Sequence, residues 1–176
     1  MDNKPFIMRP AGFSLLPFIH YLNIKDGVMV EIGSYTGEST QYFAESGKFK
    51  EIYCIDPWTN GYDDTVVVSS HCDFAIVEEE FDARMAPFDF IKKIKNYSSR
   101  AAGDFSPSSL DLVYIDGNHA YDYVIDDIQL WLPKVKKGGY LAGHDYGIRD
   151  GVKPAVNKLL GDPEIVFSDT TWVFRI

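Results

Sequence analysis

The fold is decided by one stretch near the N-terminus, because residues 28–46 read VMVEIGSYTGESTQYFAES. The first five of these residues are mostly apolar, which is typical of a buried β-strand. Two glycines follow, Gly33 and Gly37, and glycine lets a backbone turn tightly and approach a ligand closely. The residues from Glu38 to Ser46 are predicted to form a helix. A buried strand, a glycine-containing loop and a helix in this order predict an α/β protein.

The same alternation continues along the rest of the chain. Further strands are predicted at 51–55, 90–97, 110–115 and 140–143, and further helices at 12–22, 70–85, 99–105, 121–132 and 152–160. Two short apolar runs, 165–167 and 172–174, close the chain without a long helix between them. This order predicts a mostly parallel sheet with helices on both faces and one antiparallel edge strand. We expect Ser14 to cap the first helix, and Gly138-Gly139 to turn the chain before the fifth strand.

Length and composition indicate a single domain over residues 1–176, with an N-terminal helical segment (1–26) and a core (27–176). Seventeen Lys or Arg stand against 26 Asp or Glu, and the resulting charge of −9 argues against nucleic acid or an anionic membrane as a partner. No apolar run approaches the roughly 20 residues of a membrane span. No signal peptide is recognised, and two cysteines do not suggest a disulfide scaffold. We therefore expect a cytoplasmic protein.

The loop after the first strand indicates the kind of ligand. In parallel sheets, ligands bind beyond the carboxyl ends of the strands. A nicotinamide dinucleotide needs bare backbone there for its pyrophosphate, but Tyr35 fills the middle glycine position. Glu31 and Glu38 add negative charge, although Glu38 alone is explained equally well as an acid in a first helical turn. Such a loop suits a ligand with positive groups and no phosphates, such as S-adenosylmethionine.

Asp56 ends the second predicted strand, where a carboxylate can accept hydrogen bonds from both hydroxyls of a ribose. The alternative is a turn residue before Pro57, and the distance from the glycine loop favours the ribose role. Trp58 is a candidate either to cover the adenine face or to belong to the core. Glu31, Asp56, Asp116 and Asp145 together predict an acidic rim at the carboxyl edge of the sheet.

Polar side chains also follow the fourth and fifth strands, where Asp116, His119, His144 and Asp145 are expected to meet. Converging carboxylates can hold a hard cation such as Mg²⁺, and a histidine ligand favours Mn²⁺ or another transition metal. His119 is a candidate general base because its ordinary pKa lies near 6.5. Each residue alone is explained equally well by a turn, a cap or a polar strand end. Their coincidence at one edge favours a catalytic site.

Three further polar positions lie near this edge. Ser98 follows the third strand and is either a cofactor contact or the N-cap of the next helix. Asp126 and Asp127 lie on the helix after the fourth strand and are interpreted as solvated or capping residues.

Three blocks of sequence resemble the class I S-adenosylmethionine-dependent methyltransferases, and more narrowly the branch with macrolide-sugar O-methyltransferases and cephalosporin-hydroxylase-like proteins. These blocks are Val30–Thr40, Tyr53–Trp58 and Leu110–Tyr121, the last continuing to Gly138-Gly139 and Gly143–Tyr146. The resemblance spans about residues 27–160. It implies a Rossmann-like sheet of order 3-2-1-4-5-7-6, S-adenosyl-L-methionine as cofactor and a small hydroxylated methyl acceptor such as a sugar.

The resemblance also implies roles for individual residues. The cofactor contacts would be Glu31, Gly33, Ser34, Tyr35, Gly37, Ser39, Asp56, Pro57, Trp58, Ser98 and Asp116. Asp116 would also be a metal ligand, with acidic residues after the fifth strand and His119 as the catalytic base. The chain departs from this pattern by placing His144 where an acid pair is expected, so the metal set becomes Asp116, His144 and Asp145.

Three other functions remain open: a metal-dependent hydrolase, a nicotinamide-binding oxidoreductase and a non-catalytic S-adenosylmethionine-binding protein. Acceptor binding is expected to use the N-terminal segment, the 59–70 loop, the 144–153 loop or a second subunit. Three aromatic residues near the N-terminus would cover either a partner or the domain's own core, so a homo-oligomer stays open; they are Phe6, Phe13 and Phe18.

Overall fold

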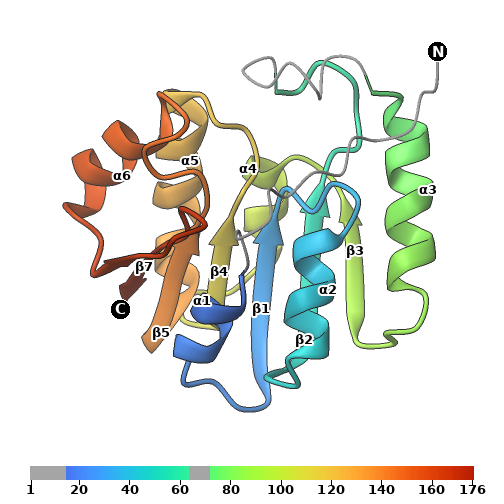
Figure 1. The fold of residues 1–176 in the computed structure, drawn as a ribbon, viewed down its shortest axis with the longest axis horizontal. Coiled ribbons are helices and arrows are strands. Elements are labelled where there is room, and N and C mark those ends of the chain that lie inside the picture. Colours follow the sequence, from blue (N-terminus) through green and yellow to red (C-terminus); the bar gives the residue numbers. More distant parts are fainter. Residues whose placement is uncertain (1–14, 64–71) are drawn as a thin grey trace.

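A computed structural model describes residues 15–63 and 72–176 of the chain. Its strands form one seven-stranded sheet in the order β3-β2-β1-β4-β5-β7-β6 (Figure 1). The strands are β1 (Gly27–Ile32), β2 (Phe49–Asp56), β3 (Ile91–Lys95), β4 (Leu110–Ile115), β5 (Val135–Gly143), β6 (Ile165–Val166) and β7 (Trp172–Arg175). The first five strands pair in parallel, and β7 runs antiparallel to both β5 and β6. The predicted fold class and strand order are therefore confirmed.

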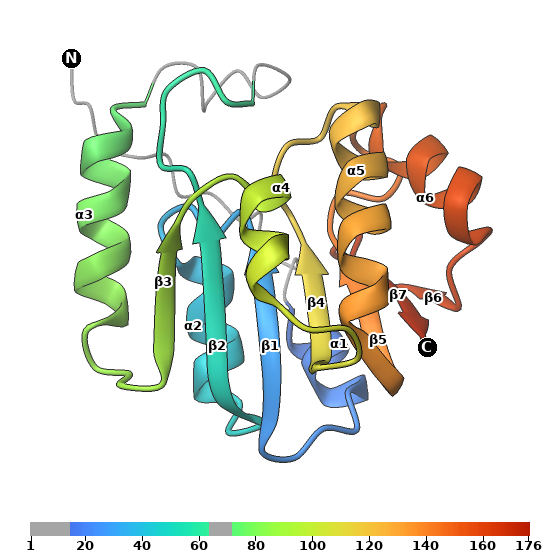
Figure 2. The same cartoon turned by 180° about the vertical axis from the view of Figure 1, so that it is seen from behind.

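Helices cover both faces of the sheet (Figures 1 and 2). One face carries α1 (Leu16–Tyr21), α2 (Glu38–Glu45) and α3 (Phe74–Met85), and the other carries α4 (Ser98–Ala101), α5 (Tyr121–Trp131) and α6 (Val152–Leu160). Side chains alternate between the two faces of a strand, so β1 sends Met29 into one apolar cluster and Val30 into the other. Both faces of the central strands are thus buried, as in other parallel sheets.

Two predictions concern the first helix and the aromatic residues near the N-terminus. The first helix begins at Leu16, later than predicted, and its expected cap Ser14 lies outside the described residues. Phe18 is fully buried and stacks on Tyr114 with ring centroids 5.8 Å apart. This aromatic residue therefore covers the domain's own core, while Phe6 and Phe13 lie outside the described residues.

The turn predicted at Gly138-Gly139 was wrong, because β5 begins at Val135 and runs through both glycines. Gly138 has φ +83°, and the register between β4 and β5 shifts between Leu110 and Leu112. From Val135 to Tyr140 β5 advances five residues while β4 advances two, and a glycine with positive φ helps a strand take up such extra residues as an irregular bulge, so the strand bends without ending. The backbone here still bonds across the sheet, since Gly138 N–H donates to the carbonyl oxygen of Ile176 at 2.5 Å.

The topology brings the ends of the parallel strands to one edge of the sheet, which lies at the top in Figure 1. Ile32 of β1 is in register with Ile55 of β2 and Ile115 of β4, and Ile115 with Gly143 of β5. The residues just after these positions must therefore lie side by side. Among helices in the described part of the chain, none is long and apolar enough to cross a membrane.

Candidate active site

The loop after β1 packs against the loop after β4. Gly33 has φ +85°, and a Cβ atom there would overlap the carbonyl oxygen of Asp116 and lie 2.6 Å from Cα of Gly117. Gly33 N–H donates to the carbonyl oxygen of Ile55 at 2.8 Å, and Gly37 N–H to that of Ser34 at 2.7 Å. The sequence predicts this glycine for close approach to a ligand, but in the structure it also permits close contact between two site loops.

Glu31 supports this loop from inside the protein. Its carboxylate is fully buried and accepts hydrogen bonds from the hydroxyls of Ser34, at 2.9 Å, and Thr40. Burial raises the pKa of Glu31 to about 7, although the hydroxyls of Ser39, Thr40 and Ser34 partly offset the rise. The side chains of Ser34 and Ser39 are themselves buried, so they face the Glu31 carboxylate and not open solvent.

Replacing Glu31 with glutamine should change how stability depends on pH. The folded-state pKa of Glu31 lies above its unfolded value, so the wild type loses free energy of unfolding as pH rises from about 4.5 to about 7. Glutamine does not titrate, so Glu31→Gln should gain roughly 2 to 3 kcal/mol relative to wild type between pH 5 and pH 8. Urea unfolding at both pH values measures this, with the exposed Glu79→Gln as control. If variant and wild type differed in free energy of unfolding by the same amount at both pH values, Glu31 would not ionise in this range in the folded protein.

Asp56 lies at the end of β2 and joins two loops. Its Oδ2 accepts from the backbone N–H of Tyr35 at 3.0 Å, and its Oδ1 accepts from that of Trp58 at 2.7 Å. Burial raises the pKa of Asp56 to about 6, and the two N–H groups oppose the rise. Each carboxylate oxygen can accept more than one hydrogen bond, so both keep capacity for a ligand. Asp56 is therefore already oriented toward the glycine loop.

Of the two roles considered for Trp58, the structure shows the core one. The indole is 4% exposed, and its ring centroid lies 4.8 Å from that of Phe81 on α3. Its Nε1–H donates to the carbonyl oxygen of Tyr35 at 2.9 Å. Trp58 thus fixes the loop against α3, and Pro57 lies half-buried between it and Asp56.

Ser98 and Asp127 form a buried pair between α4 and α5. Ser98 Oγ donates to Asp127 Oδ1 at 2.5 Å and accepts from Trp131 Nε1–H at 2.8 Å. The interpretation of Asp127 as solvated was wrong, since it is 4% exposed. The helical spacing from Val124 through Asp127 to Trp131 could have shown this, because positions three and four apart lie on one face of a helix.

The residues after β4 and β5 meet as predicted, around His119. Its Nε2 lies 3.0 Å from Asp145 Oδ2 and 3.5 Å from Asp116 Oδ1. Its Nδ1 lies 2.6 Å from Oδ2 of Asp63, a residue that the sequence analysis did not identify. Asp63 belongs to the loop after β2 and carries no periodic or motif signal, so only the folded chain reveals the contact.

Charge at His119 follows from these neighbours. Burial alone would lower its pKa, but Asp116, Asp145 and Asp63 together raise the pKa of His119 to about 11. Burial likewise works against ionisation of Asp145, yet His119 and His144 hold the pKa of this carboxyl well below its usual range. The surrounding carboxylates therefore favour the imidazolium form of His119.

The predicted metal ligands also come together. Asp116, His144 and Asp145 each offer one donor atom, and these atoms all lie within 4.8 Å of one another. His144 Nδ1 lies 3.2 Å from Asp145 Oδ1 and 3.9 Å from Asp116 Oδ1. One nitrogen and two carboxylate oxygens form a donor set that fits a divalent transition metal such as Mn²⁺.

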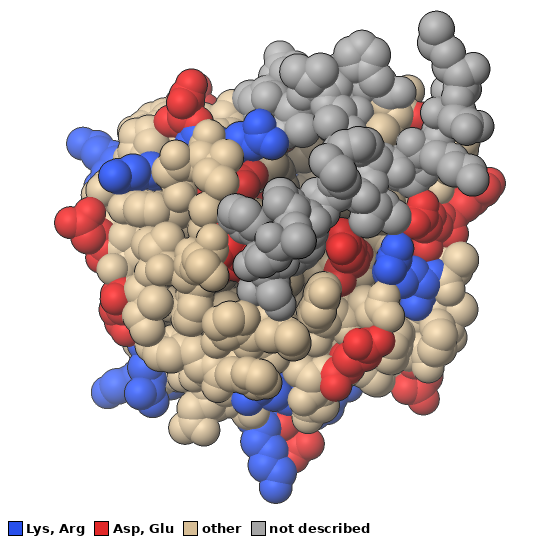
Figure 3. All heavy atoms as spheres, viewed as in Figure 1, with Lys and Arg blue, Asp and Glu red and all other residues tan. Residues whose placement is uncertain are grey.

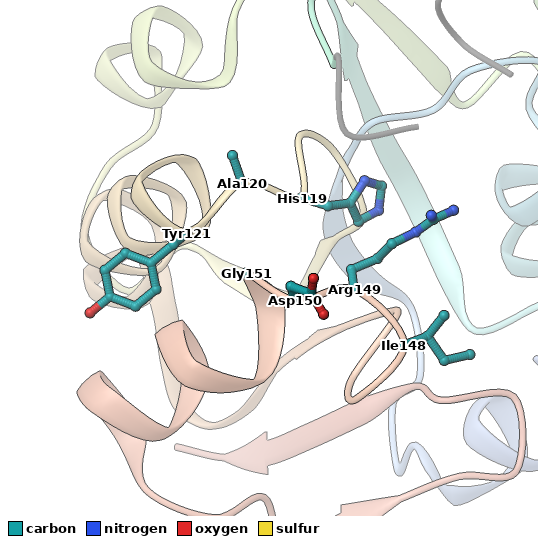
Figure 4. A pocket seen from close by; sticks show the side chains of 7 residues that line it. All are labelled: His119, Ala120, Tyr121, Ile148, Arg149, Asp150 and Gly151. Carbon is teal, nitrogen blue, oxygen red and sulfur yellow. The ribbon is translucent and has the colours of Figure 1, made fainter. Parts of the chain in front are cut away.

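A pocket of about 460 Å³ opens beside His119 (Figure 4). It is lined by His119, Ala120, Tyr121, Ile148, Arg149, Asp150 and Gly151. In Figure 4 the side chains of His119 and Arg149 extend to the same side, and Tyr121 extends to the other. Arg149 Nε lies 3.3 Å from Asp145 Oδ2, so the 144–153 loop is tied to the cluster. Gly151 lets the same loop pack closely against the start of α5, since a Cβ there would lie 2.5 Å from the backbone nitrogen of Tyr121.

Comparison with known proteins adds a family and a set of similar folds. A family model described as a methyltransferase domain matches residues 30–146. The uncharacterized protein R132 of Acanthamoeba polyphaga mimivirus is 32% identical over 148 residues, covering 78% of this chain and 61% of that protein. The uncharacterized protein y4gI of Sinorhizobium fredii (strain NBRC 101917 / NGR234) is 27% identical over 130 residues, 69% of this chain and 13% of that protein. The chain thus spans less than two thirds of either relative.

Solved structures with this fold include the O-methyltransferase NovP, with TM-score 0.62 and 17% identity over 91% of this chain and 78% of that one. An rRNA methylase from Streptococcus thermophilus has TM-score 0.60 and 15% identity over 96% and 95% of the two chains. A Haemonchus contortus phosphoethanolamine N-methyltransferase in complex with S-adenosylhomocysteine has TM-score 0.55 and 16% identity over 75% of this chain and 25% of that one. Identities this low show a shared fold.

Proposed function

Since the chain belongs to the family of methyltransferase domains, we propose that it is an S-adenosylmethionine-dependent O-methyltransferase that acts on a small hydroxylated molecule such as a sugar. The observation that carries the proposal is the half-buried His119, held by Asp63 and facing Asp116 and Asp145 beside an open pocket. Family membership favours methyl transfer over the hydrolase and the nicotinamide-binding oxidoreductase considered from the sequence.

The cofactor is proposed to lie across the ends of β1, β2 and β4. The loop from Gly33 to Gly37 would carry its methionine part, and Asp56 would accept hydrogen bonds from its ribose. Asp56 suits this role because its side chain is already fixed by two backbone N–H groups, so little conformational freedom is lost on binding. Asp116 closes the other side of the loop through its backbone contact with Gly33.

His119 is proposed to take the proton of the acceptor hydroxyl. Asp63 holds the hydrogen on Nδ1, so a neutral His119 would present Nε2 as the proton acceptor. The role requires the neutral imidazole, whereas the three carboxylates favour the imidazolium. Asp116, His144 and Asp145 would hold a divalent cation, which would supply Lewis-acid polarisation of the hydroxyl and a positive charge to offset the carboxylates.

The pocket beside His119 is proposed to bind the acceptor. Its position places a bound hydroxyl next to the base, and holding reactants together in this way supplies much of the rate in transfer reactions. A nucleic-acid acceptor is disfavoured by the net charge of −9. On the face shown in Figure 3, the basic side chains of the described residues are scattered among acidic ones and form no continuous basic surface.

Calorimetry with S-adenosylhomocysteine tests the cofactor, and methyl transfer from labelled S-adenosylmethionine to a panel of sugars and phenols tests the reaction. We expect binding by the chelator-treated protein and at least about a tenfold increase in transfer when Mg²⁺ or Mn²⁺ is restored. Asp116→Asn should remove this response to metal, and the exposed Asp104→Asn should keep it.

The outcomes separate the parts of the proposal. Failure to bind S-adenosylhomocysteine would overturn the proposed function. Methyl transfer that is indifferent to chelator would overturn the metal site alone. If the protein bound S-adenosylhomocysteine but transferred no methyl group to any hydroxylated compound, the proposed reaction would be overturned in favour of a non-catalytic S-adenosylmethionine-binding protein.

A further inference from the structure

One buried carboxylate has no part in the chemistry described so far. Asp127 lies on α5 and is 4% exposed. Its Oδ1 accepts from Ser98, but its Oδ2 has no hydrogen-bond partner among residues 15–63 and 72–176. Leaving a buried acceptor unsatisfied is costly, and more so for a charged group, so such an atom calls for an explanation.

The unpartnered oxygen lies at the carboxyl edge of the sheet. Asp127 Oδ2 is 3.9 Å from the position that a Cβ atom on Gly117 would take. Gly117 directly follows Asp116, and its Cα touches the glycine loop at Gly33. The partner of Oδ1, Ser98, follows β3, whose last residue Lys95 is in register with Asp56. Asp127 thus presents its free acceptor between the ends of β3 and β4.

Aromatic residues flank this pair in the sequence, since Tyr97 precedes Ser98 and Tyr123 lies four residues before Asp127 on α5. Tyr62 packs against Tyr97 and Tyr123, with ring centroids 5.4 and 5.7 Å away. Burial raises the pKa of the Tyr62 phenol, and Asp127 and Asp56 both add to the rise, so one side chain is within electrostatic reach of both carboxylates. Aromatic faces are the surfaces on which nucleobases stack. The surroundings suit a flat base that also donates a hydrogen bond.

We infer that Asp127 accepts a hydrogen bond from the exocyclic amino group of the cofactor's adenine and so selects adenine over hypoxanthine. The inference rests on the proposed function, in which Asp56 holds the ribose. With its ribose held by Asp56, the cofactor would extend its base along the sheet edge toward Ser98 and Gly117. A carboxylate accepts from the amine of adenine but repels the carbonyl oxygen that replaces it in hypoxanthine.

Ser98 fixes which oxygen faces the cofactor. Its hydroxyl accepts from Trp131 Nε1–H, so its own hydrogen is directed to Asp127 Oδ1. In an Asp127→Asn variant the same hydroxyl would hold the amide oxygen, and the amide NH₂ would then face the base. The variant would therefore present a donor where the wild type presents an acceptor.

Calorimetry with S-adenosylhomocysteine and S-inosylhomocysteine tests this inference. We expect the wild type to prefer the adenosyl compound by about 10- to 100-fold, as sites that hydrogen-bond a ligand group do. Asp127→Asn should change the ratio of the two dissociation constants by at least about tenfold in favour of the inosyl compound. The two bases also differ at N1, but that difference affects both proteins alike. Asp126→Asn makes the same substitution at an exposed neighbour and should keep the wild-type ratio.

A measurement on the wild type covers the case in which Asp127→Asn does not fold. An analogue with hydrogen in place of the amine should bind more tightly than the inosyl compound, because it loses a hydrogen bond without adding a repulsive oxygen. Equal binding of the adenosyl and inosyl compounds, or an unchanged ratio in a folded Asp127→Asn, would overturn the inference alone. Absence of S-adenosylhomocysteine binding by the wild type would overturn the proposed function and this inference with it.

Discussion

Replacing His119 with alanine should lower the rate of methyl transfer by about 10²- to 10⁴-fold, the range that general bases contribute. His119 is the proposed base because it lines the pocket, and Nε2 is its proposed proton acceptor because Asp63 occupies its Nδ1 side. The measurement is kcat with the best acceptor found, together with the dissociation constant for S-adenosylhomocysteine. That constant should change little, because His119 is not among the proposed cofactor contacts.

Two substitutions of Asp63 test how strongly the activity of His119 depends on its partner. Asp63→Asn can still accept from Nδ1–H and should lose less activity than Asp63→Ala, which leaves the imidazole without its partner at 2.6 Å. Asp122→Asn, an exposed acid on α5, serves as the control for charge alone. A His119→Ala variant with nearly unchanged kcat would remove His119 as the base without removing the methyltransferase assignment.

The sequence was sufficient for residues whose position follows from the topology. Asp116, His144 and Asp145 come directly after parallel strands, and parallel strands end at one edge, so their meeting could be predicted without any side-chain detail. Asp63 could not be predicted, because a loop residue 56 positions away from His119 has no register that fixes its contacts. Asp127 was misjudged because an acid on a helix is usually solvated, although its spacing placed it on the apolar face of α5.

The acidic rim expected from the sequence is weaker in the structure than a count of carboxylates suggests. Burial raises the pKa of Glu31 to about 7, so Glu31 is only partly ionised near neutral pH, whereas Asp56, whose pKa burial raises to about 6, is still mostly ionised there. Asp145 behaves in the opposite way, because two histidines keep it ionised. Negative charge is thus kept around His119, where a cation is proposed to bind, and reduced at Glu31 behind the glycine loop.

Gly33→Ala should be among the most damaging single changes to the stability of the described structure. Its φ of +85° is unfavourable for alanine, and the added Cβ would overlap the backbone of Asp116 and Gly117, which cannot rotate away. We expect a loss of at least about 3 kcal/mol in the free energy of unfolding, which for a chain of this size lowers the melting temperature by roughly 6 to 12 °C. The loop after β1 and the loop that carries Asp116 would move together.

Gly47→Ala is the matched control for this change, because Gly47 also has positive φ, at +67°, but nothing lies within 4 Å of its missing Cβ. It should lose only the cost of the left-handed backbone, about 1 to 2 kcal/mol. Thermal unfolding of both variants separates backbone strain from loop contact, and S-adenosylhomocysteine binding should weaken at least about tenfold in Gly33→Ala alone. Equal destabilisation by the two substitutions would mean that the contact between the loops after β1 and β4 contributes nothing. In that case Gly33 would be required for its backbone conformation only.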